Sequence, residues 1–307
     1  MAKIWKIDED YDCVRLDRFL RKKYSQVPLG AIMRAIRKGK ITVNGEKTEP
    51  SYRLYRGDEV SVPFENPAKL KPSLNVVDKP LEVIFMDENV LIINKPAGLL
   101  SQPASKEDDS VVNRALNLIN KTKGGFIPTP AHRLDRNISG VMALALNPRS
   151  LRALTAMFRN RRVAKKYLAV VRGRLTGEGV IEAPLERDER LLKTVVNKGE
   201  GKRSVTRYMS LSAGNHASLV ALEPITGRPH QLRVHLSHIG HPIVGDVKYG
   251  DSGKEARRPM LHAYSLEIFG NDLSYLAGKK FCAPLPADVA AVINLFDLSF
   301  DTIIGML

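Results

Sequence analysis

The segment AHRLDRNISG, residues 131–140, places a carboxylate between two guanidinium groups and then enters an apolar run. Arg133 comes two positions before Asp135, and Arg136 directly follows it. Because neighbouring positive charge favours the ionised form of a carboxyl group, we expect Asp135 to be a carboxylate at neutral pH. Such a group is suited to act as a nucleophile on an anionic substrate. The same spacing is also typical of a surface salt bridge ahead of a strand, so spacing alone leaves both interpretations open.

Positive charge is concentrated around this segment. The chain has 307 residues and a formal net charge of +15, and residues 133–174 contain eleven Lys or Arg but one acid, Asp135. A basic chain is expected to bind acidic partners, of which nucleic acid is the commonest. A solvated basic face is the alternative. The position of the cluster beside Asp135 favours an anionic polymer that passes this loop.

Residues 1–65 are expected to form a small module of their own. Apolar residues recur at helical spacing in residues 14–21, and a second helix is expected over residues 31–38, ended by Gly39. Residues 41–62 hold two strand-like stretches with tight turns. Four cations on or just beyond the second helix are candidate phosphate ligands: Arg34, Arg37, Lys38 and Lys40.

A proline- and lysine-rich segment, residues 66–80, predicts a semi-extended linker to the rest of the chain, residues 81–307. That larger part mixes strand-like and helical runs in an order that fits an α+β domain better than repeated βαβ units. Strands are expected at residues 83–86, 90–94, 141–146, 168–172, 205–211 and 217–222, and helices at 110–119, 149–158 and 230–238.

Several classes of protein are not favoured by the sequence. Cys13 and Cys282 are remote from each other and lack metal-ligand spacing, which is typical of free thiols in a reducing cytoplasm. The acidic N-terminal segment lacks the apolar core of a signal peptide, and no apolar run approaches the length of a membrane span. We therefore expect a cytoplasmic protein without a membrane partner. The absence of a long apolar seam favours a monomer.

Cofactor and metal signals are also missing from the sequence. There is no phosphate-binding P-loop and no strand-borne glycine fingerprint for a dinucleotide. His235, His238 and His241 lie close in sequence, but no acidic or cysteine ligand stands at useful spacing. We expect no metal and no cofactor.

Four segments carry a recognisable pattern in order along the chain, among them the one around Asp135: INKPAGL (93–99), HRLDRNISG (132–140), KKYLAVVRG (165–173) and TGRPHQLRVH (226–235), which GHPIVGD (240–246) continues. Together they resemble the motifs of the RluA-type pseudouridine synthases, from about Val83 to the region of Leu285. One departure is Ile138, where the family more often has Thr. The two N-terminal helices with KGKITVNG (38–45) and GDEV (57–60) resemble an S4-type RNA-binding domain.

The resemblance implies an α+β pseudouridine synthase fold, a long mixed and mainly antiparallel sheet flanked by helices and loops, preceded by the small S4-type α/β domain. It implies isomerisation of uridine to pseudouridine in RNA, with no cofactor and no redox change. Within the family, the N-terminal pattern is most similar to synthases of the large ribosomal subunit. The implied substrate is therefore large-subunit ribosomal RNA.

The resemblance also implies roles for single residues. Asp135 matches the nucleophile, which attacks either the base ring or the anomeric carbon of the sugar. Arg233 matches its basic partner, and Tyr167 matches a tyrosine that stacks on the flipped uracil and serves in proton transfer. Arg133 matches an arginine that can fill the gap left by the extruded nucleotide.

Three other side chains complete the expected site. Arg136 and Arg228 are candidate RNA ligands, and Arg228 is placed to bind phosphate near a helix start. His132 is a further candidate that is also expected to shape the loop. Lys95 lies outside this set, beside Pro96-Ala97-Gly98, and is expected simply to solvate that turn.

Three alternatives remain open at this point. One is a transfer-RNA pseudouridine synthase of the same fold. Another is a non-catalytic RNA-binding or ribosome-assembly factor, against which the intact Asp135, Tyr167 and Arg233 argue. The third is a basic nuclease or hydrolase, for which the sequence offers neither a metal cluster nor a catalytic triad.

Overall fold

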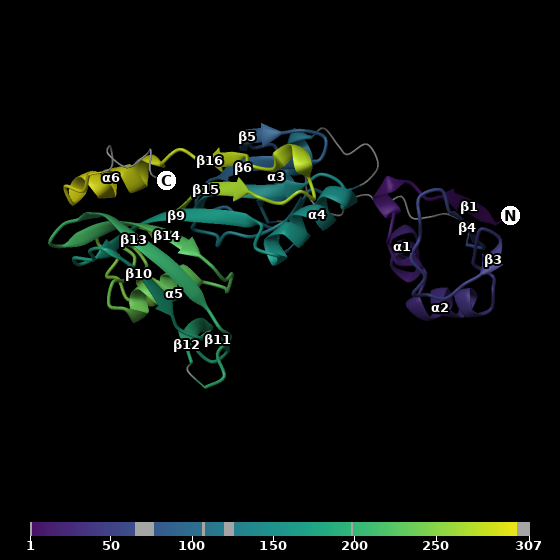
Figure 1. Cartoon of the computed structure of the whole chain (residues 1–307), viewed down its shortest axis with the longest axis horizontal. Helices are drawn as coiled ribbons and strands as arrows, with labels where there is room; N and C mark the ends of the chain where they lie inside the picture. The colour runs from purple at the N-terminus through teal and green to yellow at the C-terminus, as the bar shows by residue number, and fades with distance from the viewer. Residues whose placement is uncertain (1, 65–76, 106–107, 120–125, 198, 300–307) are drawn as a thin grey trace.

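The computed structural model describes residues 2–64, 77–105, 108–119, 126–197 and 199–299. Figure 1 shows a small N-terminal unit at one end of the molecule and a larger unit built on one long sheet. The expected linker, residues 66–80, lies outside the described residues except for its last four. Described contacts between the two units include an ion pair from Arg149 to Glu9 at 3.3 Å and a hydrogen bond from Arg152 to the Asp10 carbonyl at 3.0 Å.

The N-terminal unit packs two helices against a four-stranded sheet of order β1-β4-β2-β3. Its elements are β1 (Lys3–Lys6), α1 (Leu16–Lys23), α2 (Leu29–Arg37), β2 (Thr42–Val43), β3 (Glu46–Lys47) and β4 (Glu59–Val62). The apolar positions that predict the helices form the core, because Leu16, Phe19 and Leu20 of α1 are all buried against α2 and the sheet. Both expected helices are therefore confirmed.

The larger unit contains a sheet of order β10-β13-β14-β9-β15-β8-β6-β5, with β16 beside β15 and β7 beside β8. Its strands are β5 (Glu82–Met86), β6 (Val90–Lys95), β7 (Thr129–Pro130), β8 (Ser139–Ala145), β9 (Val163–Arg172), β10 (Glu178–Glu182), β13 (Val205–Ala213), β14 (Ala217–Pro224), β15 (Leu261–Ile268) and β16 (Lys280–Cys282). Among the described strands, β8 and β15 form the one parallel pair, so the expected mixed, mainly antiparallel sheet is confirmed.

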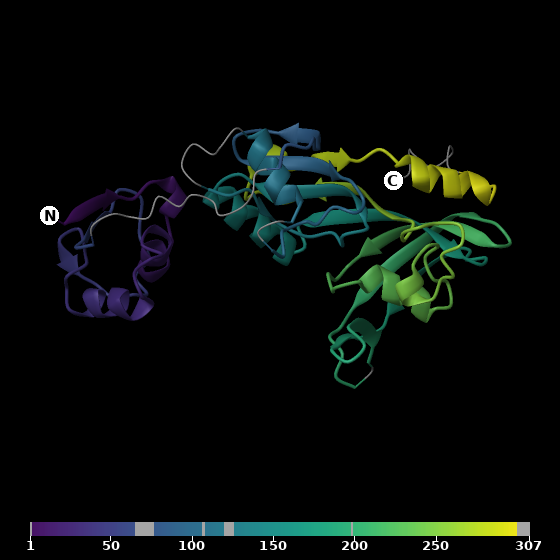
Figure 2. The same cartoon turned by 180° about the vertical axis from the view of Figure 1, so that it is seen from behind.

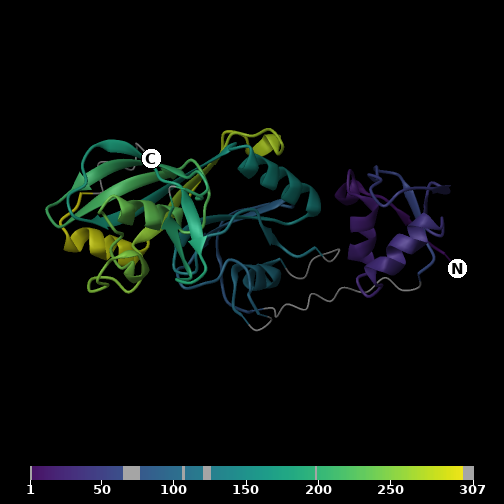
Figure 3. The ribbon, with the colours of Figure 1, turned by 90° about the horizontal axis from the view of Figure 1, so that it is seen from below.

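Helices cover both faces of this sheet, as Figures 1 and 2 show from opposite sides. They are α3 (Val111–Leu118), α4 (Pro148–Arg159), α5 (Gln231–His238) and α6 (Ala287–Leu295). A separate hairpin, β11 (Leu185–Asp188) with β12 (Lys193–Val196), projects beyond α5. Seen from below in Figure 3, α4 lies on the side of the sheet that faces the N-terminal unit. The strands β1, β7, β10–β12, β15 and β16 and the helix α6 were not expected from the sequence.

The central strand β8 explains why the sheet needs cover on both faces. All seven of its residues are buried. Met142 and Leu144 join one hydrophobic cluster, while Val141 and Ala143 join the other, as the two-residue period of a strand requires. Gly140 pairs with Ala263 where β8 lies beside β15, and its φ is +120°. A Cβ at this position would lie 2.2 Å from the carbonyl oxygen of Ala263, so only glycine fits there. The strand that follows Asp135 is therefore fixed in the core.

Candidate active site

A cavity of about 530 Å³ opens beside the loop that carries Asp135. Its walls come from that loop, from the start of β9 and from the segment that joins β14 to α5. Asp135, Tyr167 and Arg233 all line it. The tertiary structure therefore brings together three separate motifs, of which the first and last lie 98 positions apart.

The loop around Asp135 is anchored on both sides of the carboxylate. The N–H of Ile138 donates to the carbonyl of Asp135 at 3.1 Å, which closes a turn. The hydroxyl of Ser101 donates to the carbonyl of Leu134 at 2.7 Å and accepts from its N–H at 3.1 Å. Ile138 is 2% exposed and packs in the main apolar cluster, so the chain uses an apolar anchor here. The Asp135 side chain remains 33% exposed, open to the cavity.

Lys95 ties a second turn to this loop. Its side chain is 0% exposed. Its ammonium donates to the carbonyls of Leu99 at 2.7 Å, Pro96 at 2.9 Å and Arg136 at 3.0 Å. Burial lowers the pKa of Lys95 to about 7, and the nearby Asp135 carboxylate opposes this shift. One buried side chain thus holds the turn after β6 against the residue that follows Asp135.

Arg233 is aimed at Asp135 by a second carboxylate. Its Nη1 lies 3.1 Å from Oδ2 of Asp135. Asp246 accepts from Nε and from Nη2 of the same guanidinium, each at 2.7 Å. The Asp246 side chain is buried at 1% exposed, and the Arg233 side chain is 11% exposed. Because two charge-assisted bonds fix the plane of the guanidinium, Nη1 is held toward Asp135.

His230 approaches the same carboxylate from the start of α5. It adopts left-handed backbone angles, with φ 55°, which is uncommon for a residue other than glycine. Its Nε2 lies 3.6 Å from Oδ2 of Asp135, and its Nδ1 lies 2.7 Å from the hydroxyl of Tyr249. Burial lowers the pKa of His230, although the Asp135 carboxylate opposes the shift. The ring therefore faces Asp135 in its neutral form at pH 7.

Tyr167 forms the buried wall of the cavity. It lies in the middle of the sheet, paired with Leu222 of β14 and Ala263 of β15, and is 9% exposed. Burial raises the pKa of its phenol far above the ordinary value, and the Asp135 carboxylate raises it further. The hydroxyl is therefore protonated at physiological pH. The ring offers a stacking surface, and the hydroxyl offers a proton donor or relay.

Three arginines expected to bind RNA also line the cavity, and each is exposed at its rim: Arg133, Arg136 and Arg228. Two of them are partly restrained, since Nε of Arg136 donates to the carbonyl of Gly98 at 3.1 Å and Nε of Arg228 donates to the carbonyl of Arg203 at 3.3 Å. The rim of the cavity is thus positively charged around a single carboxylate.

His132 lines the cavity but is engaged in the structure of the loop. Its Nε2 accepts from the N–H of Ala143 at 3.1 Å, and its ring centroid lies 4.7 Å from that of Phe158. Burial lowers the pKa of His132 to about 3, so the ring carries no charge at neutral pH. This geometry favours the expected role in shaping the loop over an ionic contact with RNA.

The N-terminal cations lie elsewhere. Arg34 and Arg37 in α2, Lys38 at its end and Lys40 beyond it are all exposed on the N-terminal unit. The structure does not bring them into the cavity. A contact with RNA there would have to be separate from the active site.

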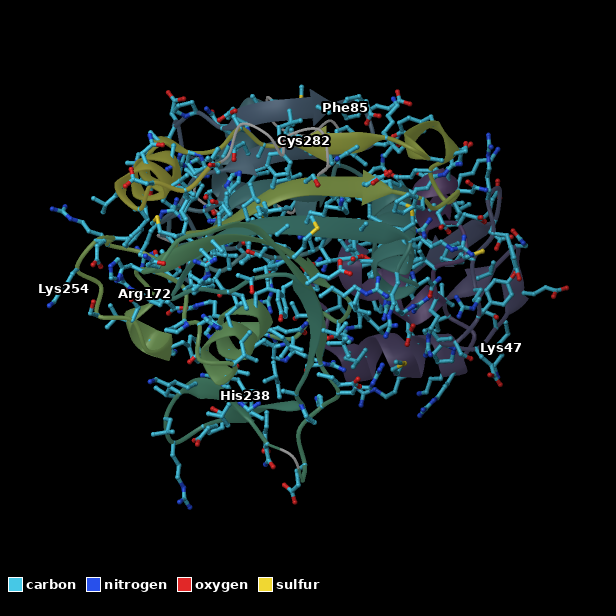
Figure 4. The ribbon with its side chains drawn as sticks, turned by 60° about the vertical axis from the view of Figure 1, so that its left-hand side comes forward. Lys47, Phe85, Arg172, His238, Lys254 and Cys282 are labelled. Atoms are coloured by element: carbon cyan, nitrogen blue, oxygen red, sulfur yellow. The ribbon has the colours of Figure 1, made fainter. Side chains whose placement is uncertain are left out.

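The described part of the chain contains no group of three or more His, Cys, Asp or Glu placed to hold a metal ion. His235 is buried between the Thr206 hydroxyl and the Ala183 carbonyl, each 3.0 Å from a ring nitrogen, whereas His238 is exposed at the end of α5 (Figure 4). In the same described residues no helix has the length and apolar character to cross a membrane.

Comparison with known proteins shows the family to which the chain belongs. Residues 89–238 match the family model described as RNA pseudouridylate synthase, and residues 14–60 match the S4 domain. The chain is 36% identical over 287 residues to ribosomal large subunit pseudouridine synthase D of Borreliella burgdorferi, covering 90% of this chain and 87% of that protein. The chain belongs to the RluA-type pseudouridine synthases.

Two further comparisons extend this result. Ribosomal large subunit pseudouridine synthase C of Escherichia coli is 35% identical to this synthase, covering 87% of this chain and 88% of that protein. A solved structure of human RNA pseudouridylate synthase domain containing 4 superposes with a TM-score of 0.58 at 27% identity, covering 71% of this chain and 94% of the human one.

The sequence analysis gave no site role to His230, Asp246 or Tyr249, and it did not anticipate the burial of Lys95. Asp246 and Tyr249 follow the last motif, and only the fold of residues 240–250 brings them to Arg233 and His230. Asp246 ends the GHPIVGD segment, and a second acid close to the motif that carries Arg233 is a usable signal. Lys95 carried no such signal, because its burial depends on the Arg136 carbonyl 41 positions away.

Proposed function

We propose that this synthase isomerises specific uridines of large-subunit ribosomal RNA to pseudouridine, with Asp135 as the nucleophile. The names of its relatives support the choice of RNA. The excess of 48 Lys and Arg over 33 Asp and Glu supports binding to a polyanion. Since ribosomal RNA is made and modified where ribosomes are assembled, we propose that the protein acts in the cytoplasm.

The reaction needs a nucleophile but no redox partner. The bond from N1 of uracil to C1′ of the ribose breaks, the base rotates, and a bond from C5 to C1′ forms. The proton on C5 leaves to solvent, and N1 gains one. Asp135 attacks either the uracil ring or C1′, and the covalent intermediate splits one difficult step into two easier ones.

The surrounding side chains then have separate tasks. Arg233, held by Asp246, orients the Asp135 carboxylate through a charge-assisted hydrogen bond. Tyr167 supports the flipped base with its ring and moves the C5 proton through its hydroxyl. Arg133, exposed at the rim, fills the gap in the RNA from which the uridine was extruded.

The N-terminal unit supplies a second contact with RNA. We propose that residues 1–65 form an S4-type RNA-binding domain and that residues 81–307 form the catalytic domain, joined by residues 66–80. The exposed cations Arg34, Arg37, Lys38 and Lys40 contact phosphates away from the target uridine.

The observation that carries this proposal is the Asp135 carboxylate, open to a basic cavity and directed by a clamped arginine. The test is to incubate the protein with unmodified large-subunit ribosomal RNA and, separately, with transfer RNA. Pseudouridine is then mapped by carbodiimide treatment and primer extension. Discrete stops on the ribosomal RNA are expected with wild type and with the matched surface variant Asp272→Asn, and none with Asp135→Asn.

Two results would contradict the proposal. Primer-extension stops on transfer RNA alone would show that transfer RNA, not ribosomal RNA, is the substrate. Undiminished stops with Asp135→Asn would remove Asp135 from the role of nucleophile.

A further inference from the structure

A second cleft, of about 620 Å³, adjoins the active-site cavity. The two share five lining residues, among them Lys165 of β9 and Arg228 of the segment before α5. The second cleft continues from this shared boundary to the end of α4, the turn into β9 and the residue after β15. An RNA strand whose uridine enters the first cavity can therefore continue directly into the second.

Positive charge lines this cleft from several elements. Arg159 ends α4, Arg161 lies in the turn before β9, and both are exposed. Lys165 and Arg228 add charge at the boundary with the active site. The acid in the lining, Glu223, has its carboxylate 3.6 Å from Arg207. Four cations against one paired acid predict an anionic ligand.

The cleft also presents an aromatic surface. Phe269 lines it and is 55% exposed, although a phenyl ring is ordinarily buried. Its backbone is fixed, because its N–H donates to the carbonyl of Arg162 at 2.8 Å. An exposed ring among arginines is the combination that binds unpaired nucleotides, through stacking on the base and ionic contact with the phosphate.

We propose that this second cleft holds one unpaired nucleotide next to the target uridine, with its base on Phe269 and its phosphate among Lys165, Arg159 and Arg161. Extruding the uridine breaks the stacking of its neighbours, and a protein surface that receives one of them recovers part of that cost. The inference rests on the proposed function, because the strand enters from the active-site cavity.

The first test separates binding from chemistry. Large-subunit ribosomal RNA is transcribed with tritium at C5 of uridine, and tritium released in a single turnover is followed over a range of enzyme concentrations. Phe269→Leu is expected to raise the half-saturating concentration about five- to fiftyfold, with the limiting rate within threefold of wild type. Phe269→Tyr, which keeps an aromatic ring, is expected to stay within twofold.

The charge is tested with a matched pair of double variants. Arg159→Gln with Arg161→Gln is expected to raise the half-saturating concentration about tenfold and to reduce its dependence on salt. Lys254→Gln with Arg257→Gln removes the same charge from an exposed loop that lines neither cavity; Lys254 is labelled in Figure 4. This control is expected to stay within twofold. Thermal melting of each variant establishes that it is folded.

A second test locates the nucleotide. After the modified uridine is mapped, stem-loops are made with an abasic site on its 5′ or its 3′ side. One of the two abasic RNAs is expected to raise the half-saturating concentration of wild type as much as Phe269→Leu raises it on intact RNA. On that abasic RNA, the Phe269→Leu variant is expected to bind no more weakly than wild type does. The inference would be overturned if the effects of the abasic site and of Phe269→Leu on the half-saturating concentration multiplied on both RNAs. It would also be overturned if wild type and Phe269→Leu had the same half-saturating concentration on intact RNA.

Failure of the proposed function gives a different result. Wild-type protein that releases no tritium from ribosomal or transfer RNA refutes the activity. The cleft is then judged by anisotropy of a fluorescent single-stranded octauridylate. Weaker binding by Phe269→Leu than by Phe269→Tyr supports the cleft, and equal binding refutes it.

Discussion

Asp246→Asn tests whether Arg233 works only when a buried carboxylate holds it. The Asp246 side chain accepts two hydrogen bonds at 2.7 Å from Arg233 and is 1% exposed. Asparagine has one acceptor oxygen, and its amide group would face a guanidinium N–H. One charge-assisted bond is therefore lost, and the hydrogen bonds of charged groups contribute about 1.5–3 kcal/mol each.

The effect on turnover follows from this loss. If about 3 kcal/mol of orientation is missing when Asp135 attacks, the rate falls about a hundredfold, since about 1.4 kcal/mol corresponds to a factor of ten. Stability to urea is expected to fall by about 2–3 kcal/mol, because the guanidinium remains buried without its full counter-charge. Tritium release from C5-labelled ribosomal RNA under single-turnover conditions measures the rate.

The matched control is Asp109→Asn. Asp109 also accepts two hydrogen bonds from one arginine, Arg114, at 2.9 and 2.8 Å, but neither residue lines the cavity. This variant is expected to lose some stability and to keep its limiting rate within threefold of wild type. A folded Asp246→Asn protein that also stays within threefold of wild type would refute the positioning of Asp135 through Arg233.

Two further predictions concern Tyr167 and Lys95. Tyr167→Phe keeps the ring but removes the hydroxyl, so the limiting rate of tritium release is expected to fall by about 10²- to 10⁴-fold with half-saturation unchanged; an unchanged rate would assign Tyr167 to stacking alone. Lys95 has a folded-state pKa of about 7 against an ordinary value of 10.5, so the unfolded chain binds its proton at a higher pH. The Lys95 contribution to the free energy of unfolding is therefore present at high pH and lost as pH falls from about 10.5 toward 7. Between pH 9 and pH 7, the free energy of unfolding of the wild type is expected to fall by about 2 kcal/mol more than that of Lys95→Met. Urea unfolding at the two pH values measures this, and parallel curves for both proteins would contradict it.

Local patterns in the sequence predicted much of the secondary structure. Helices α1, α2 and α4 carry clear apolar periodicity. Asn147 caps the N-terminus of α4 and forms a capping box with Ser150, and Pro148 is the first residue of the helix. Strands β6 and β8 are continuous apolar runs, as expected of strands buried on both faces. Among the missed elements, β16 is short and β10 is half-exposed, so their apolar signal is weak. Strand β15 is long and mostly buried, but His262 and Ser265 interrupt its apolar pattern.

The spatial arrangement of the site depends on contacts that no local pattern encodes. Strand β15 pairs with both β8 and β9, and this places the loop of Asp135 beside Tyr167. The hydrogen bonds of Asp246 with Arg233, and of Lys95 with the Arg136 carbonyl, join segments that only the assembled fold brings together.

The sequence by itself determined the chemical groups: a carboxylate among arginines, a tyrosine, a basic surface and an N-terminal module with exposed cations. Those identities follow from residue types and short spacings, which physical chemistry interprets without coordinates. The tertiary structure decided which groups face one another, which are buried and therefore shifted in pKa, and where a second basic cleft adjoins the first. Burial and direction depend on neighbours remote in the chain, and only the folded sheet brings those neighbours together.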